Sequence, residues 1–562
     1  MLVLVAAGFA LWLAHARAWD LGRRSPVLGF DAAQYALAAR TLAEQGKLGT
    51  TFALPIELVK HPSPPWPLAA VQPGLVLAEA AVDRLVPPVL GSRQRPILTL
   101  QMPHQREWLT LVIPFVSYLM LTALLALLTA RLIARHAPAA TAVERAAAAL
   151  TVGGAFLLDP EAQHFAIGAF TELPYTLGLV AAIAWIAIGR TPAPLLFGLL
   201  LGVTGAFRGN LLWLAPWLAA GAAALAPEGR RRRAFALVML GYALPLLPWW
   251  IYKWRTFGHP AWDLSALALW DGVGTRTWFS LTHLPAMPDL PRGWEAVSSV
   301  AGKLARNTGP LLLGMTVGPR GLWIGAIVVW LVAVRGGARP LKVAGWIVLV
   351  HAAIAVIVAG LGAGWLRYLF PARVPLEAAG VLASWALLGR VPPQALGPQA
   401  VQAARVAVVA LALGWGGWQT ARGNAEAAAT VASRGLPSVS TLRDLGHRLR
   451  RELAPGEPVM SNLGPTLAWY ARRPVVHLAL TPADVDACRA RLPFRHVVIA
   501  FREVEHAWRG WDELVRDPGS ARANPGWNVR DVRAWRTHGD GFTVVWVELA
   551  PMAPSFALAG GR

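Results

Sequence analysis

Long apolar runs separated by short polar gaps follow one another from the first residue to about residue 418. Most of these runs approach the length that a helix needs to cross a bilayer. They cover residues 1–16, 108–130, 142–158, 172–189, 193–207, 211–226, 234–252, 308–333, 343–361, 368–389 and 401–418. The pattern predicts a polytopic α-helical membrane protein with about eleven transmembrane helices.

After residue 418 the pattern changes to short helical and strand-like segments in alternation. Helices are expected at 441–453, 466–471, 484–492 and 506–515, and strands at 458–461, 475–478, 496–501 and, as a final β pair, within 529–549. Such alternation is typical of an α/β domain. The sequence therefore predicts a transmembrane domain over residues 1–418, with a large loop at 17–107, and a soluble α/β domain over residues 419–562.

Charge orients the predicted spans. Hydrophobic residues make up 55% of the chain and charged residues only 15%, yet the net charge is +21. Basic residues cluster in short gaps between alternate runs, as at Arg230 to Arg233, and positive charge keeps such loops in the cytoplasm. Loops 17–107 and 253–307 and the C-terminal domain then face outward. This predicts a multi-pass protein of the inner (cytoplasmic) membrane with an extracytoplasmic C-terminal domain.

Two broad features of the sequence limit its partners and covalent structure. The chain contains no recognisable basic recognition motif, so nucleic acid is not an expected partner despite the positive charge. The single cysteine, Cys488, excludes an internal disulfide. The first apolar run is open to two interpretations, a retained helix or a cleaved signal peptide, because Ala14-His15-Ala16 resembles a signal-peptidase site.

Asp31 is the first candidate for chemistry, because it stands in the large loop after the first run, at the start of an amphipathic stretch that extends to Glu44. Gly46 is a suitable residue to end such a helix. Asp31 has two interpretations. Its carboxylate could cap the helix N-terminus, or it could take a proton from an acceptor hydroxyl as a general base.

Several short motifs occur in an order that resembles a known superfamily. After Asp31 and its Tyr-containing helix come His61-Pro62-Ser63-Pro64-Pro65, Gln72-Pro73-Gly74, Thr171-Glu172, Phe207-Arg208-Gly209-Asn210, Tyr252 to Pro260, Arg367-Tyr368-Leu369-Phe370-Pro371 and the tail segment Ser461 to Leu478. Their order and sidedness resemble the GT-C superfamily of polyprenyl-phosphate-sugar glycosyltransferases, which includes the protein O-mannosyltransferases and the lipid A aminoarabinose transferases. The resemblance implies a GT-C-like fold, with Asp31 as the catalytic base. Many relatives have a second acidic residue directly after this Asp, where this chain has Ala32.

Basic residues at the outer ends of the predicted spans suit a lipid-phosphate donor, whose leaving group is an anion. The candidates for binding the donor phosphate are Arg208, Lys253, Arg255 and Arg367, with Tyr368 beside the last of these. Guanidinium groups match phosphate geometry, and stabilising the departing phosphate would be a catalytic role. The alternative is that these side chains extend to the headgroups of ordinary membrane lipids.

Glu172 and His61 are candidates for binding the acceptor or a metal ion. Glu172 begins an apolar run, where a carboxylate is costly unless it lines a polar cavity or pairs with a neighbouring arginine. The resemblance implies a divalent metal ion as a cofactor in this region, but no close His/Glu spacing matches a zinc site, so metal dependence stays open. Arg373 and Glu377 are four residues apart within one predicted span, and we expect them to pair with each other.

Together with these residues, the resemblance to the GT-C superfamily implies an integral membrane glycosyltransferase. It would transfer a sugar, a hexose or a pentose, from a polyprenyl-phosphate donor to an extracytoplasmic acceptor, which would be a cell-envelope glycan, lipid or protein. The alternative is a transporter or flippase for a lipid-linked sugar, although the chain lacks the internal repeat that many transporters show. A protein that only anchors a binding domain would not need so many spans.

Overall fold

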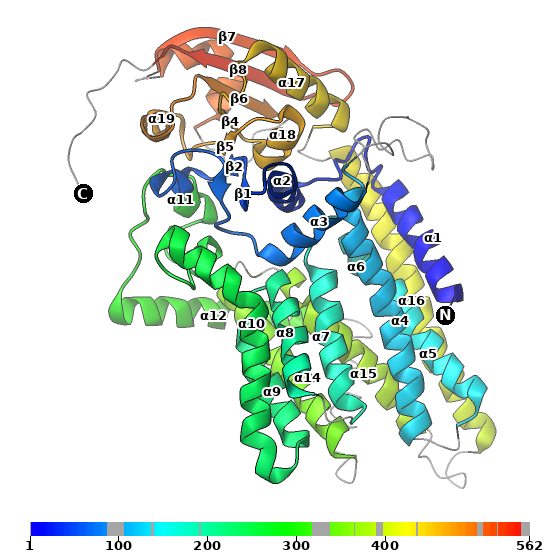
Figure 1. Cartoon of the computed structure of the whole chain (residues 1–562). Helices are drawn as coiled ribbons and strands as arrows, with labels where there is room; N and C mark the ends of the chain where they lie inside the picture. Colours follow the sequence, from blue (N-terminus) through cyan, green and yellow to red (C-terminus); the bar gives the residue numbers. More distant parts are fainter. Residues whose placement is uncertain are drawn as a thin grey trace.

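The computed structural model describes residues 2–86, 106–136, 140–189, 193–316, 338–362, 364, 366–388, 397–433, 437–502, 510–524 and 527–551. Within these ranges the chain forms a long helical bundle that carries a six-stranded sheet at one end (Figure 1). We call that end of the bundle the sheet end. The second part of the predicted span 308–333 and residues 506–509 of a predicted tail helix lie outside the described residues.

Each predicted apolar run overlaps a helix in the described part of the chain, where the run 308–333 is represented only by residues 308–316 at the end of α12. These helices are α1 (Leu2–Ala18), α4 (Leu109–His136), α5 (Ala142–Leu157), α7 (Glu172–Ala187), α8 (Pro194–Phe207), α9 (Leu211–Leu225), α10 (Arg231–Phe257), α12 (Gly293–Thr316), α14 (Arg339–Leu361), α15 (Phe370–Leu388) and α16 (Pro398–Ser433). Among the described residues, four helical segments are long and apolar enough to cross a membrane, namely Leu109–His136, Glu228–Phe257, Arg339–Leu361 and Gln399–Val431. Helices α1, α7, α8 and α9 are shorter and apolar.

Glycines bring α8 and α10 together along their length. A Cβ atom at Gly198 would lie 2.2 Å from the Val238 carbonyl oxygen, and one at Gly202 would lie 2.5 Å from the Tyr242 carbonyl oxygen. Such small-residue faces let two helix backbones approach closely. Because both contacts advance by four residues on each helix, α8 and α10 run in the same direction. Their C-terminal ends therefore both reach the sheet end of the bundle.

The loop 17–107 contains two helices, α2 (Phe30–Gln45) and α3 (Pro73–Leu85), and short strands β1 (Gly49–Thr50), β2 (Phe52–Ala53) and β3 (Trp66–Pro67). Helix α2 ends as predicted at Gly46, which has φ 67° and donates its N–H to the Leu42 carbonyl. Figure 1 shows α2 between the sheet and the bundle. The turn η1 (Pro55–Val59) connects β2 to the His61 segment.

The predicted loop 253–307 is more structured than its sequence indicates. It contains η4 (Leu264–Trp270) and α11 (Trp278–Thr282), and α12 begins at Gly293 rather than near residue 308. The start of α12 was missed because its first half is amphipathic rather than uniformly apolar. Buried Lys303 fixes this half by donating to the carbonyls of Ala268, at 2.7 Å, and Leu269, at 3.3 Å. Figure 1 shows α12 extending sideways from the bundle.

The six-stranded sheet has the order β2-β5-β4-β6-β8-β7. Its other strands are β4 (Val459–Ser461), β5 (Val475–His477), β6 (His496–Phe501), β7 (Val529–Arg536) and β8 (Thr543–Leu549), and its helices include α17 (Val439–Glu452), α18 (Gly464–Ala471), α19 (Val485–Arg491) and α20 (Asp512–Arg516). The tail elements follow the predicted alternation closely. Strand β2 is the exception, because it comes from the loop 17–107 and pairs in parallel with β5. Residue 418, the predicted domain boundary, lies inside α16.

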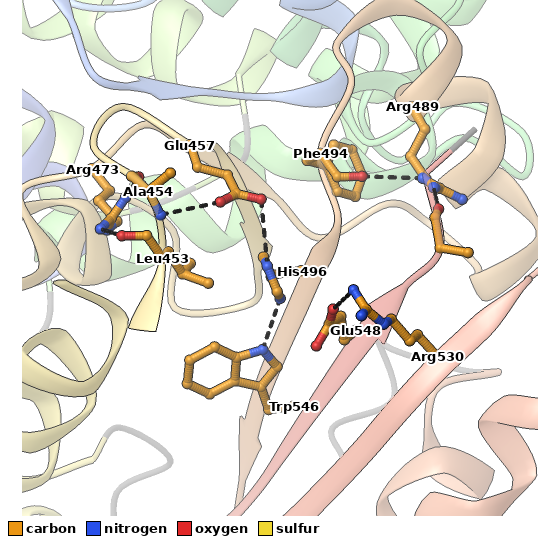
Figure 2. A network of polar contacts seen from close by, with 11 residues as sticks. Leu453, Ala454, Glu457, Arg473, Arg489, Phe494, His496, Arg530, Trp546 and Glu548 are labelled. Carbon is orange, nitrogen blue, oxygen red and sulfur yellow. Dashed lines mark hydrogen bonds and ion pairs between the residues drawn. The ribbon is translucent and has the colours of Figure 1, made fainter. Parts of the chain in front are cut away.

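Polar side chains join the sheet to the segment between α17 and β4 (Figure 2). Trp546 donates its ring N–H to His496 Nδ1 at 3.0 Å, and His496 Nε2 lies 3.4 Å from Glu457. Arg473 donates to the carbonyls of Leu453 and Ala454, which directly follow the last residue of α17. These contacts satisfy backbone groups that the helix end would otherwise leave unpaired.

Candidate active site

Asp31 lies in the first turn of α2, and its carboxylate faces an arginine from a distant part of the chain. Its Oδ2 accepts a hydrogen bond from Arg367 Nη1 at 2.7 Å. Arg367 lies in η6 (Leu366–Leu369), directly before α15. The residue that caps α2 is Gly29, without a side-chain hydrogen bond, so the helix-capping interpretation of Asp31 is wrong. The side chain of Asp31 remains 38% exposed, which leaves its carboxylate accessible to a substrate.

Arg208 and Glu172 form a second ion pair beside the first. Arg208 is the residue that ends α8, Glu172 begins α7, and their Nη1 and Oε1 atoms are 2.9 Å apart. Both side chains are almost fully buried, with 11% and 5% exposed. The structure therefore favours the interpretation in which the costly carboxylate of Glu172 is balanced by a neighbouring arginine.

The ring of Tyr368 connects the two arginines. The guanidinium carbon of Arg208 lies 5.2 Å from the ring centroid, and that of Arg367 lies 5.4 Å from it. An aromatic face attracts cations at such distances. Tyr368 thus holds two guanidinium groups near one another, although their like charges repel.

Tyr35, one turn after Asp31 on α2, completes this group of residues. Its hydroxyl forms a hydrogen bond with Thr171. Burial raises the pKa of Tyr35 well above its usual value, and the nearby charges of Glu172 and Asp31 raise it further. The phenol therefore stays protonated and can act as a hydrogen-bond donor, but it cannot serve as a base near neutral pH.

Lys253 and Asp263 form a third ion pair, close to the end of α10. Their Nζ and Oδ2 atoms are 3.2 Å apart, and Lys253 is buried. Gln72 donates its amide N–H to the same oxygen of Asp263 at 2.9 Å and accepts the ring N–H of Trp249 at 3.1 Å. Lys253 also lies 5.0 Å from the centroid of the Trp249 ring.

Close backbone packing joins this third pair to the Arg208 turn. A Cβ atom at Gly74 would lie 2.6 Å from the carbonyl carbon of Ala206, so only glycine fits at this position. A Cβ atom at Gly209 would lie 3.3 Å from the Gln72 amide nitrogen. The Gln72-Pro73-Gly74 segment therefore rests directly on the end of α8. The order of the motifs along the sequence grouped this segment with the other site motifs. That order did not indicate which residues the segment contacts.

The remaining predicted residues have different positions. The side chain of Arg255 is exposed on α10, apart from the three ion pairs. His61 packs against Phe257 with ring centroids 5.5 Å apart and lines a pocket next to Asp263. The predicted pair of Arg373 and Glu377 is confirmed at 3.3 Å, and Arg373 also pairs with Asp159 and Glu161.

The charged groups of the site are balanced. Asp31, Glu172 and Asp263 each pair with one cation, from Arg367, Arg208 and Lys253 respectively. Within the residues that the structure describes, no three His, Cys, Asp or Glu side chains gather to hold a metal ion. A divalent ion therefore stays a prediction of the resemblance. Sequence reasoning missed Asp263 because no motif points to it, and only the fold brings it to Lys253.

Comparison with solved structures identifies the same architecture elsewhere. The chain is similar to ArnT from Cupriavidus metallidurans bound to undecaprenyl phosphate, with a TM-score of 0.54, 12% identity and coverage of 100% of this chain and 99% of that one. The apo state of ArnT gives a TM-score of 0.54 at 13% identity, covering 97% of each chain. No family model matches the sequence, and no curated protein matches it.

A third solved structure has a similar architecture. The archaeal oligosaccharyltransferase AglB from Archaeoglobus fulgidus, in complex with an inhibitory peptide and a dolichol-phosphate, has a TM-score of 0.50 at 12% identity, covering 88% of this chain and 69% of that one. ArnT, an aminoarabinose transferase, and AglB are both GT-C members. The chain therefore has the fold of the GT-C superfamily, in agreement with its sequence motifs, and is a multi-pass membrane protein.

Proposed function

We propose that this protein is a membrane glycosyltransferase that moves one sugar from a polyprenyl-phosphate donor to an acceptor on the extracytoplasmic side of the inner membrane. The observation that carries the proposal is the pairing of a partly exposed carboxylate, Asp31, with Arg367. A second arginine, Arg208, lies beside this pair and is buried. The acceptor needs a base for its hydroxyl, and the polyprenyl-phosphate donor needs cations for its phosphate. The site offers both within a single group of contacting side chains.

Asp31 acts as the general base in this proposal. The acceptor oxygen attacks the anomeric carbon of the donor sugar while its proton passes to Asp31 Oδ, and the bond from the anomeric carbon to the phosphate oxygen breaks. A single displacement of this kind inverts the configuration at the anomeric carbon. Arg367 orients the carboxylate by its hydrogen bond, and Asp31 remains exposed enough to meet a hydroxyl.

Arg367 and Arg208 stabilise the departing polyprenyl phosphate. Arg367 uses Nη1 to hold Asp31, and a planar guanidinium has further N–H groups directed elsewhere. Tyr368 keeps the guanidinium of Arg208 next to that of Arg367, so a phosphate between them would face two cations. Such charges, placed before the reaction, stabilise the negative charge that develops on the leaving group. Lys253 is more buried and already balanced by Asp263, and it acts at the edge of the site.

The alternative of a transporter for lipid-linked sugars makes a different use of the same groups. It would need binding and passage of the donor without cleavage of the sugar–phosphate bond. The partly exposed carboxylate held by Arg367 favours chemistry over passage, because transport has no need of a base oriented at a surface.

The test is sugar transfer by the purified full-length protein in lipid. Radiolabelled polyprenyl-phosphate sugars carrying different hexoses and pentoses are offered together with crude cell-envelope acceptors. We expect transfer of at least one sugar, and a loss of about 10²–10⁴-fold in Asp31→Asn, which is the usual contribution of a general base. Asp512→Asn, in an exposed ion pair on α20, is the matched control and should transfer normally. Donor binding without turnover across the whole panel would instead support the transporter.

A further inference from the structure

A pocket next to the Asp31 and Arg208 ion pairs, but separate from them, lies beyond the end of α10. It has an empty volume of about 680 Å³, open mouth included, and is bounded by η1, the end of α10, η4 and the segment before α12. Aromatic rings form much of its wall: Trp66, Phe257, Trp262 and Trp270. Phe257 and Trp262 stack on each other with centroids 4.0 Å apart and planes inclined by 15°. Together they form a flat, rigid side of the pocket.

Two buried polar atoms of residues that line the pocket have no hydrogen-bond partner within the described residues. They are Nε2 of His61 and the ring N–H of Trp66, whose side chain is fully buried. A buried polar atom without a partner in the protein is costly unless a water molecule or a ligand binds it. Both atoms belong to residues that line the same pocket. They favour an occupant with hydrogen-bonding groups, such as water or a hydroxyl-bearing ligand, over a purely apolar one.

Glu57 adds a third polar group to the same wall. Its Oε2 accepts the Leu54 N–H at 2.7 Å, which fixes the side chain in position. Burial raises the pKa of Glu57 to about 8, so the carboxyl is mainly protonated at neutral pH. A neutral carboxyl group can donate as well as accept, which suits a ligand that carries hydroxyls.

Asp263 places the pocket directly beside the proposed active site. It lines the pocket, and its Oδ2 accepts from Lys253 and Gln72 on the side of the active site. The pocket contains none of the residues of the Asp31 and Arg208 pairs. It is thus a neighbouring chamber that shares one wall with the site, and it is not the place where the donor phosphate meets Arg367.

We infer that this pocket binds a sugar ring of the acceptor, so that the acceptor is a glycan. An aromatic wall packs against the C–H face of a pyranose or furanose, while His61 and Glu57 provide hydrogen-bonding groups for its hydroxyls. A lipid chain would match the apolar wall but would leave those polar atoms unsatisfied. This inference rests on the proposed function only where it calls the bound glycan the acceptor. Binding of a saccharide to the pocket can be measured independently of sugar transfer.

Saturation-transfer NMR on the full-length protein in detergent micelles tests the pocket directly. The probes are the methyl glycosides of mannose, glucose, galactose and arabinose, with octyl phosphate as a probe for lipid chains. At least one glycoside should receive saturation from the wild type, and its signal should fall at least fivefold in Trp262→Ala. Trp294→Ala is the matched control, because Trp294 is 79% exposed on α12 and does not line the pocket. His61→Ala provides a second variant that leaves the aromatic wall intact, and should also lower the signal.

Three results would overturn the inference. The first is the absence of a saturation-transfer signal from every glycoside. The second is an equal glycoside signal in the wild type and both pocket variants. The third is a signal that depends on Trp262 for octyl phosphate but for none of the glycosides. The transfer assay separates this inference from the proposed function. If the wild type transfers no sugar but binds a glycoside through Trp262, the pocket stands and the proposed transfer fails. If transfer occurs and Trp262→Ala raises the KM for the acceptor at least fivefold without changing the KM for the donor, both stand.

Discussion

The ion pair between Glu172 and Arg208 makes the sharpest prediction about stability. In Glu172→Gln the side chain keeps its shape, but the guanidinium of Arg208 loses its carboxylate partner while only 11% of its side chain is exposed. Breaking a buried pair by removing one partner typically costs about 3–5 kcal/mol, since a charge is left without compensation. Asp512→Asn breaks a pair with Arg516 in which 38% and 76% of the side chains are exposed, and should cost no more than about 1 kcal/mol.

A double variant shows whether the cost comes from the orphaned charge. Glu172→Gln with Arg208→Met removes both charges from the buried pair, so most of the lost stability should return. A remainder of about 0.3–1 kcal/mol is expected, because Glu172 also stands at the N-terminus of α7, where the helix dipole favours a negative charge. Unfolding by titration with SDS in mixed micelles measures the free energies. A cost below about 1 kcal/mol for Glu172→Gln, or additive effects in the double variant, would refute the reasoning.

Three further predictions concern backbone packing, pH and donor binding. Gly74→Ala forces a Cβ against the carbonyl carbon of Ala206, which is backbone and cannot turn aside, so SDS titration should show a loss of about 1–3 kcal/mol. Burial lowers the pKa of His477 to about 3. The unfolded chain then binds more protons below pH 6.5, so the wild type should lose about 2 kcal/mol between pH 7 and pH 5 on this account, and His477→Gln should lose less. Arg367→Lys replaces a planar fork by a point charge and should raise the KM for the donor about tenfold in the transfer assay, with a smaller effect on folding.

The helices and the tail strands could be predicted because their signals are local. An apolar run predicts a helix from its own residues alone. The alternation from residue 441 onward predicted the bounds of most tail helices and strands to within a few residues. The start of α12 was missed for the same reason, since its first residues mix Trp294 and Glu295 with serines and look like a loop. Strand β2 has only two residues, Phe52 and Ala53, and its partner in β5 lies several hundred residues away, so no local pattern could reveal it.

The candidate site was predictable as a set of residues but not as a set of contacts. Asp31 and Arg367 are 336 residues apart, and the sequence suggested only that both stand at span ends on the same side. Glu172 was open to a metal, an acceptor or a neighbouring arginine, and the fold selects the arginine. No sequence motif pointed to Asp263. It meets Lys253 because the chain turns back after α10, where Leu264 donates its N–H to the carbonyl of Ala69.

The C-terminal part of the chain takes part in positioning Asp31, even though it follows the last span. Arg40 of α2 donates to the carbonyls of Trp469 and Ala468 at 3.1 and 3.4 Å, and its guanidinium lies 4.6 Å from the centroid of the Trp469 ring. At the other end of α2, Phe30 packs against His477 with ring centroids 5.3 Å apart. Both ends of the helix that carries Asp31 therefore contact the segment from α18 to β5. Because β2 also enters the same sheet, a change in the tail would move Asp31 relative to Arg367, which the bundle holds.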